Sequence, residues 1–153
     1  MYLKTLLVLH GLGAIIGFGP TFAYSVLGPL ASKEQGPGGL AILRGMVGIE
    51  RRFVLPIALV VQPVTGALLI FASKWKDDFF SHTWLWVSIV LYVIALCISI
   101  LVMNPTLHRM VLSAERGGGP EMATLGARSA RFSPILTVLT VVIVVLMLWK
   151  PGS

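Results

Sequence analysis

The chain has 153 residues, of which 56% are hydrophobic and only 12% are charged, and its formal net charge is +6. A soluble domain averages about 25% charged residues, so this composition excludes an ordinary soluble domain and indicates an integral membrane protein. The basic residues form no dense run, and we therefore do not expect nucleic acid as a partner.

Four long blocks without Asp, Glu, Lys or Arg predict four membrane-spanning helices. They cover residues 5–32, 53–73, 79–108 and 132–149, and a hydrocarbon core of about 30 Å needs about 20 helical residues. We expect an all-α fold, a single four-helix transmembrane domain over 1–153, with a lipid bilayer as its surroundings. The predicted spans are about 5–29, 53–73, 83–107 and 132–149, with cytoplasmic extensions of helices two and four at about 40–52 and 120–131.

The first span places a histidine and two glycines on one helical face. His10, Gly13, Gly17, Thr21 and Tyr24 follow one another at steps of three or four residues, which puts them in line on a helix. The spacing of Gly13 and Gly17 is the small-residue pattern that lets two helices approach closely. His10 is therefore predicted to face the bundle, and the glycines to make room for a neighbouring helix or for a flat cofactor.

Three interpretations of His10 remain open from the sequence. It is hydrogen-bonded across a helix interface, for example to Gln62 or Tyr92; or it is a cofactor ligand; or it relays protons. As a cofactor ligand, His10 would either bind the iron of a haem b, as the residue assigned as candidate metal ligand, or anchor a quinone. The candidate cofactor-binding residues are His10, Gly13, Gly17, Gln62, Thr65 and Tyr92, and the polar ones among them are expected to share a layer in the outer half of the membrane. No catalytic residue is assigned.

The second span carries the segment QPVTG at 62–66, for which two interpretations are open: it is only a structural kink, or it lines a pocket facing His10. Local kinks or unwinding are predicted at Pro20, Pro56, Pro63 and Pro105, because proline removes a backbone donor. The short loop after this span predicts that spans two and three are antiparallel neighbours. No acidic residue lies inside a predicted span, which argues against a carboxylate-based ion pump.

The third span holds the single cysteine, Cys97, which we interpret as a small buried residue, and the polar Ser88, Tyr92 and Asn104. The histidines His82 and His108 fall near its two ends. A weak internal repeat relates GPGG and RRFVLP to GGGP and ARFSP, so the fold is expected to consist of two parallel helical hairpins, with chance similarity as the alternative.

The distribution of basic residues predicts the orientation. The loops after spans one and three hold eight lysines and arginines, and the opposite side holds four; the positive-inside rule then puts both termini outside the cytoplasm. Aromatic residues at the opposite, outer interface support this orientation: Tyr2, Trp75, Trp84, Trp86 and Trp149. We expect a multi-pass protein of the bacterial cytoplasmic (inner) membrane.

Several segments together resemble an uncharacterised, domain-of-unknown-function family of predicted four-helix bacterial integral membrane proteins. They are TGALLI, WLWVSIVLYVIAL, NPTLHRM and LMLWKPG, together with the early first-span histidine. The layout is more distantly similar to four-helix, haem-containing protoporphyrinogen oxidases and to the membrane domain of D-type copper-resistance proteins. Those families imply a first-span histidine that corresponds to His10, while the third-span lysine of the oxidases has no counterpart here.

The resulting hypothesis is a cofactor-binding, redox-related membrane protein holding haem b or a quinone. The alternatives are an accessory or structural subunit, as a homo-oligomer or within a larger membrane complex, and a small-molecule or metal transporter. Whether the chain is an enzyme stays open.

Overall fold

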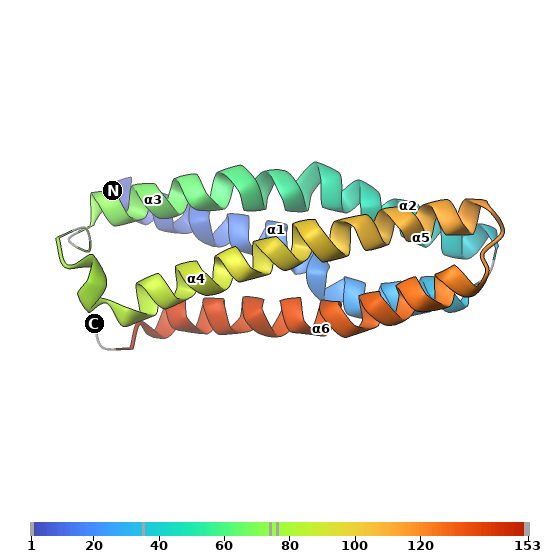
Figure 1. The fold of residues 1–153 in the computed structure, drawn as a ribbon. Helices are drawn as coiled ribbons and strands as arrows, with labels where there is room; N and C mark the ends of the chain where they lie inside the picture. The colour runs from blue at the N-terminus through green and yellow to red at the C-terminus, as the bar shows by residue number, and fades with distance from the viewer. Residues whose placement is uncertain (1, 35, 74, 76, 152–153) are drawn as a thin grey trace.

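The fold is a bundle of four long helical segments, seen in a computed structural model that describes residues 2–34, 36–73, 75 and 77–151. The segments run side by side, and α1 begins and α6 ends at the same end of the bundle (Figure 1). The first segment is α1 (Tyr2–Lys33) and the fourth is α6 (Pro120–Trp149). No strand occurs among the described residues, so the predicted all-α class is confirmed.

The two middle segments are composite helices. The second consists of α2 (Pro37–Ile49), η1 (Glu50–Val54), η2 (Ile57–Val61) and α3 (Gln62–Ala72). The third consists of α4 (Thr83–Ile98), η5 (Ser99–Met103) and α5 (Asn104–Glu115), and the short 3-10 turn η4 (Phe79–Ser81) precedes it. All four segments are long and apolar enough to cross a membrane. The predicted extensions at 40–52 and 120–131 are helical, whereas the position of the bilayer along the helices stays a prediction.

The π-helical turns of the composite helices each end just before a proline. Glu50–Val54 precedes Pro56, Ile57–Val61 precedes Pro63, and Ser99–Met103 precedes Pro105. Proline has no N–H and its ring crowds the carbonyl four residues earlier, so the backbone widens locally. The predicted unwinding is therefore confirmed at these three prolines, while α1 stays α-helical through Pro20.

Helices two and four begin in the same way. Gly36 has a φ of 106° directly before Pro37, and Gly119 has a φ of 130° directly before Pro120. Only glycine adopts such angles readily, and proline suits the first turn of a helix, where its missing N–H is not needed. This shared start is what two hairpin repeats would show, but α6 crosses Pro134 without a π turn; the repeat stays a prediction.

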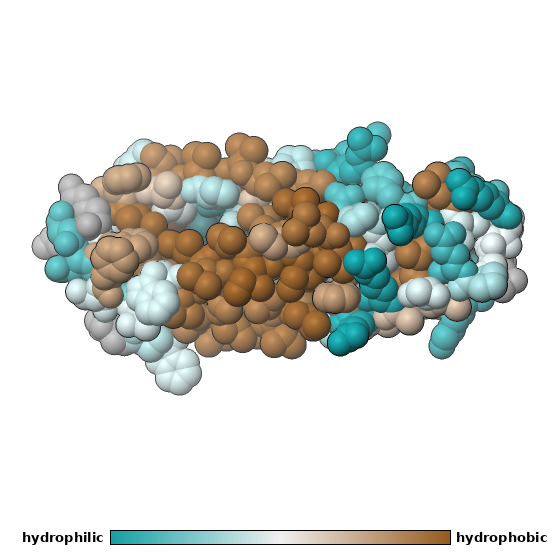
Figure 2. Space-filling model, viewed as in Figure 1, coloured by the Kyte–Doolittle hydropathy of each residue, from teal (hydrophilic) through white to brown (hydrophobic). Residues whose placement is uncertain are grey.

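The surface of the bundle is divided into an apolar middle and a hydrophilic end. Large apolar side chains cover its middle, and hydrophilic side chains gather at the end where α2 and α5 lie (Figures 1 and 2). Ile15, Phe71 and Leu101 are each about 70% exposed. Apolar surface of this extent is compatible with lipid contact and not with water.

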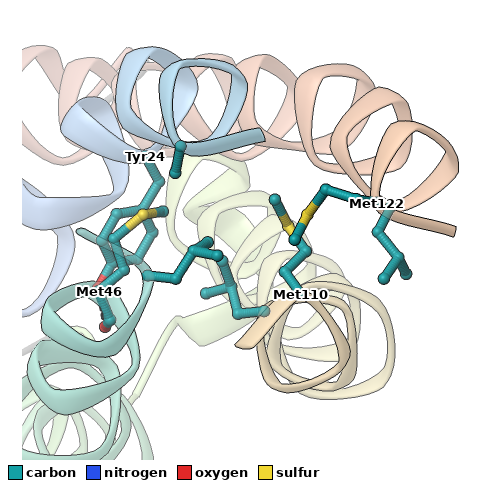
Figure 3. Packing of buried hydrophobic residues seen from close by; sticks show 8 residues of the cluster. Tyr24, Met46, Met110 and Met122 are labelled. Atoms are coloured by element: carbon teal, nitrogen blue, oxygen red, sulfur yellow. Dashed lines mark hydrogen bonds between the residues drawn. The ribbon is translucent and has the colours of Figure 1, made fainter. Parts of the chain in front are cut away.

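The core at the hydrophilic end holds four helices together. Tyr24 of α1 packs against Met46 of α2, and Met110 of α5 points toward Met122 of α6 (Figure 3). The Tyr24 hydroxyl also donates a hydrogen bond to the Met46 carbonyl at 3.2 Å. Methionine fills irregular gaps because its thioether chain is flexible, so this cluster joins all four helices at one level.

The opposite end of the bundle is arranged in pairs. There α3 packs against α1, and α4 packs against α6, so spans two and three are close neighbours through α2 and α5 rather than along their whole length. The second and third long helices are therefore neighbours from α2 and α5 as far as Ala58 and Tyr92, and α3 and α4 diverge beyond that point (Figure 1). The described part of the loop between α3 and α4 contributes Trp75, whose ring meets that of Trp84 edge-on at 5.2 Å.

The burial of two residues differs from what their place in the sequence suggested. Trp84 is only 2% exposed and packs inside this end of the bundle, with Trp75 and Lys150 against its ring, while its place at the outer interface stays a prediction. Cys97 is exposed rather than buried, because it lies on the side of α4 that faces away from the other helices. In a bilayer that side contacts lipid.

Candidate functional site

The candidate site is built around one hydrogen bond between the first and second long helices. His10 Nδ1 on α1 lies 2.9 Å from Thr65 Oγ1 on α3. Gln62 and Tyr92 were named as examples of a partner for His10 across the interface; in the structure the partner is Thr65, one turn beyond Gln62 and also one of the candidate residues. His10 is half-buried and Thr65 is buried, so the pair lies at the helix interface, as the sequence indicated.

The hydrogen-bond network assigns the tautomer of His10. The Thr65 hydroxyl donates its proton within its own helix, at 2.6 Å from the Val61 carbonyl. Its oxygen is then an acceptor for His10. Nδ1 of His10 must therefore carry the proton and donate it to Thr65, which leaves a lone pair on Nε2. No hydrogen bond to Nε2 is found in the part of the chain that the structure describes.

Glycines allow the two helices to come this close. A Cβ atom placed on Gly66 would lie 3.3 Å from His10 Cε1, so the imidazole rests directly on the α3 backbone. A Cβ atom on Gly13 would lie 2.8 Å from Gln62 Oε1. Gln62 is buried and its Oε1 accepts no hydrogen bond from any described residue. Thr65 and Gly66 of the segment QPVTG thus face His10, and a pocket lined by this segment stays a prediction.

The glycine face is filled by protein. A Cβ atom on Gly17 would lie 2.7 Å from Ile57 Cγ2, just as Gln62 occupies the space beside Gly13. The sequence analysis offered a neighbouring helix or a flat cofactor beside these glycines, and in the structure the neighbouring helix fills the space. A flat macrocycle such as haem b therefore does not fit against Gly13 and Gly17.

Tyr92 and Ser88 belong to the same part of the bundle but make other contacts. The Tyr92 hydroxyl donates a hydrogen bond to the Ala58 carbonyl, which joins α4 to the second long helix. Its ring meets Phe18 of α1 edge-on at 6.0 Å. Ser88 is fully buried and donates to the Trp84 carbonyl of its own helix at 2.6 Å. Tyr92 therefore closes the space between three helices, and no contact joins it to His10.

The described part of the chain brings no metal-binding cluster together. Among residues 2–34, 36–73, 75 and 77–151, no three His, Cys, Asp or Glu side chains gather at one point. His82 packs beside Trp84, with ring centroids 6.3 Å apart, and His108 lines a groove at the opposite end. His10 is the residue that remains as a ligand candidate.

A second polar cluster was missed by sequence reasoning. Glu50, expected in a solvated extension beside Arg51 and Arg52, is only 3% exposed. Ser99 Oγ of η5 donates a hydrogen bond to Glu50 Oε1 at 3.2 Å, and the Tyr24 hydroxyl also lies within hydrogen-bonding reach of this carboxyl group. Glu50 lies outside the predicted span 53–73, so the statement about acidic residues in the spans did not cover it, yet its carboxyl group is buried between the helices.

A signal for the burial of Glu50 was present in the sequence. The side chains at steps of three or four residues from it are all buried, and they form one stripe: Leu43, Met46, Glu50, Val54 and Ala58. A stripe of this spacing marks the core face of a helix. The adjacent arginines suggested the interface, although they lie on the other side of the helix.

Taken together, the four apolar helices and the polar groups held between them define an integral membrane protein with a four-helix bundle. The chain belongs to the DUF2269 family of predicted integral membrane proteins, whose family model matches residues 4–151. This family membership supports the resemblance to an uncharacterised membrane family. Comparisons with curated proteins and with solved structures found no match.

Proposed function

We propose that this membrane protein binds a lipid-soluble ligand of the quinone class at His10. The observation that carries the proposal is the hydrogen bond from His10 Nδ1 to Thr65 Oγ1, at 2.9 Å. It fixes the ring and leaves the Nε2 lone pair as an acceptor. A hydroxyl group of a quinol is a donor of matching chemistry.

The surroundings of His10 support a hydrophobic ligand. A polar side chain inside a membrane helix is costly and usually marks a site, and the His10 ring rests on Gly66 while remaining half-exposed. Neighbouring surface residues of α1 are apolar, with Leu7 43% and Leu9 49% exposed. A ligand that reaches Nε2 would therefore enter from the lipid and keep its tail there.

The alternatives make different demands on the same residue. A haem b ligated by His10 would need space other than the glycine face, which Gln62 and Ile57 fill. An accessory subunit would use His10 only to join α1 to α3. The proposed orientation, with both termini outside the cytoplasm of a bacterial inner membrane, places the quinone site in the outer half of the bilayer.

Binding of a short-chain quinol to the protein in lipid nanodiscs tests the proposal. The variants H10A and T65V should each weaken binding about tenfold, equivalent to about 1.4 kcal/mol, because T65V removes the acceptor that sets the tautomer. T65S keeps the hydroxyl and should bind as the unchanged protein does. T140V is the matched control, since Thr140 is a buried threonine of α6 that also bonds its own helix, at 2.9 Å.

Equal binding by all four variants would overturn the proposal and leave His10 a packing residue. A visible spectrum of protein expressed with ample haem provides the second readout. A Soret band that disappears in H10A would show that His10 binds haem b rather than a quinone.

A further inference from the structure

A groove at the hydrophilic end of the bundle has no role in the packing described so far. It lies between the second and third long helices, has a volume of about 740 Å³, and is lined on one side by Arg44, Arg51 and Arg52 and on the other by His108. It is separate from the His10 site, because His10 pairs with α3 near the other end of the second long helix. Its volume and its basic side chains are those of a site that could bind an anionic molecule.

Two glycines keep the groove hollow. Gly45 and Gly48 line it, and a Cβ atom placed on either would meet nothing within 4 Å. Gly13 and Gly17, in contrast, would bring a Cβ atom to within 2.8 Å of the second long helix. The small size of Gly45 and Gly48 therefore serves no contact between described residues, and the space that they leave is open to a molecule from outside the chain.

The charge of the groove fits an anion. Arg44 forms an ion pair with Glu115 at 2.9 Å, so its charge is largely balanced. Arg51 and Arg52 are exposed, and no acidic side chain pairs with either among the described residues. Glu50 faces an adjoining small pocket together with Arg51 and His108, and the hydroxyl of Ser99 bonds its carboxyl group. The exposed guanidinium groups of Arg51 and Arg52 thus give the lining of the groove an excess of positive charge.

The second long helix also gives the groove an apolar part. Phe53 is 51% exposed and Ile49 is 40% exposed, and both line the groove. Phe53 begins the long uncharged block of the second helix, so this apolar part continues onto the lipid-facing surface. A free phosphate ion would use the arginines alone, whereas a phospholipid would use the arginines and the apolar part at once, its phosphate beside the guanidinium groups and its acyl chains along Phe53.

We propose that this groove binds the headgroup of an anionic phospholipid, with Arg51 and Arg52 as its phosphate contacts. Guanidinium groups bind phosphate through two parallel hydrogen bonds. Basic pockets between membrane helices are suited to headgroups of this charge. The lipid would thereby occupy the groove between the second and third long helices.

Native mass spectrometry of the detergent-released protein, equilibrated with phosphatidylglycerol and phosphatidylcholine, tests this. The unchanged protein should retain phosphatidylglycerol in preference to phosphatidylcholine. R51Q/R52Q should lower the retained phosphatidylglycerol about tenfold. G48L should lower it similarly without any change of charge, because leucine fills the hollow; its folding is checked by thermal melting, and G45L provides an independent second filling.

The matched control is R128Q, which removes an exposed arginine of α6 that does not line the groove. It should retain the lipid as the unchanged protein does. Equal retention by R51Q/R52Q, G48L and R128Q would overturn the proposal. So would full displacement of phosphatidylglycerol by millimolar inorganic phosphate, which would identify a simple anion site. H10A should retain as much phosphatidylglycerol as the unchanged protein does. The lipid proposal is therefore tested independently of the quinone proposal.

Discussion

Ser99 donates a hydrogen bond to Glu50 at 3.2 Å, and the two residues belong to π-helical turns on different helices. Each of these turns ends just before a proline, Pro56 in one helix and Pro105 in the other. π turns occur often at functional sites, because they redirect a side chain that a regular helix would place elsewhere. Here they bring a carboxyl group and a hydroxyl group together inside an apolar bundle.

This relationship predicts a graded response to substitutions of Glu50. E50Q keeps an oxygen that accepts the hydrogen bond of Ser99, so its melting temperature in detergent should stay close to that of the unchanged protein. E50L has a similar volume but no acceptor. It should lower the free energy of unfolding by about 1–3 kcal/mol, because Ser99 loses its buried partner.

The control for Glu50 is E121L, a change of the same chemistry at an exposed position in the first turn of α6. It should change the melting temperature much less than E50L does. If E50Q destabilises the protein as strongly as E50L, the bundle requires the charge of the carboxylate rather than its hydrogen bond, and the prediction is wrong.

The orientation in the membrane can be tested with the single cysteine removed. In a C97A background, D78C lies in the loop between α3 and α4, and E121C lies at the start of α6; both positions are exposed. A membrane-impermeant maleimide should label D78C in intact cells and E121C only after the cells are broken, because basic loops stay in the cytoplasm. The reverse pattern would contradict the predicted orientation and place the lipid groove in the other leaflet.

The fold could be predicted from the sequence because a lipid environment leaves few choices. Backbone groups must bond within their own segment, so four long apolar blocks imply four helices, and Gly36-Pro37 and Gly119-Pro120 mark where two of them begin. Packing between the helices was harder to predict. The separation of α3 from α4 at one end depends on how the side chains of each helix pack against its neighbours. Hydropathy predicts which segments span the membrane, but it does not predict which helices pack together.

The partner of His10 could not be predicted for a specific physical reason. Two π turns, Glu50–Val54 and Ile57–Val61, lie before Gln62. Each adds about one residue to a turn and so rotates the following residues by about 100° relative to a regular helix. Ideal helical geometry therefore does not show whether Gln62 or Thr65 meets His10, although both were in the candidate set.

Glycines on α1 provide a direct test of helix packing. G17A would place a Cβ atom 2.7 Å from Ile57 Cγ2 and 3.2 Å from Ile57 Cβ. Ile57 is branched at Cβ and cannot easily turn away, so G17A should lower the free energy of unfolding by about 1–3 kcal/mol. G19A meets nothing within 4 Å and should be neutral or stabilising by up to about 1 kcal/mol, because alanine favours the helix.

Melting temperatures of the two glycine variants, measured in the same detergent, check this difference. G17A should lower the melting temperature less when it is added to I57A than when it is added to the unchanged protein, because alanine at position 57 leaves room for the new Cβ atom. Equal melting temperatures for G17A and G19A would show that the first and second helices are not in close contact at Gly17.

The contact between α1 and α6 gives a further test of helix packing, because it holds two glycine–serine pairs. The pairs differ in whether only the serine Oγ or also the serine Cβ lies close to the glycine. A Cβ atom on Gly28 would lie 2.6 Å from Ser129 Oγ but 3.6 Å from Ser129 Cβ. A Cβ atom on Gly126 would lie 2.8 Å from both Oγ and Cβ of Ser32. Removing the serine hydroxyl therefore relieves the first clash and leaves the second.

Ser129 Oγ is buried and bonds no described residue, so S129A should change the free energy of unfolding by less than about 0.5 kcal/mol. G28A should cost about 1–3 kcal/mol, and G28A/S129A should regain most of that loss, with a coupling energy of about 1 kcal/mol or more. G126A/S32A should regain little, because Ser32 Cβ still lies too close. Thermal melting of the two double-mutant cycles measures both couplings, and equal recovery in the two pairs would contradict the packing of α1 against α6 described above.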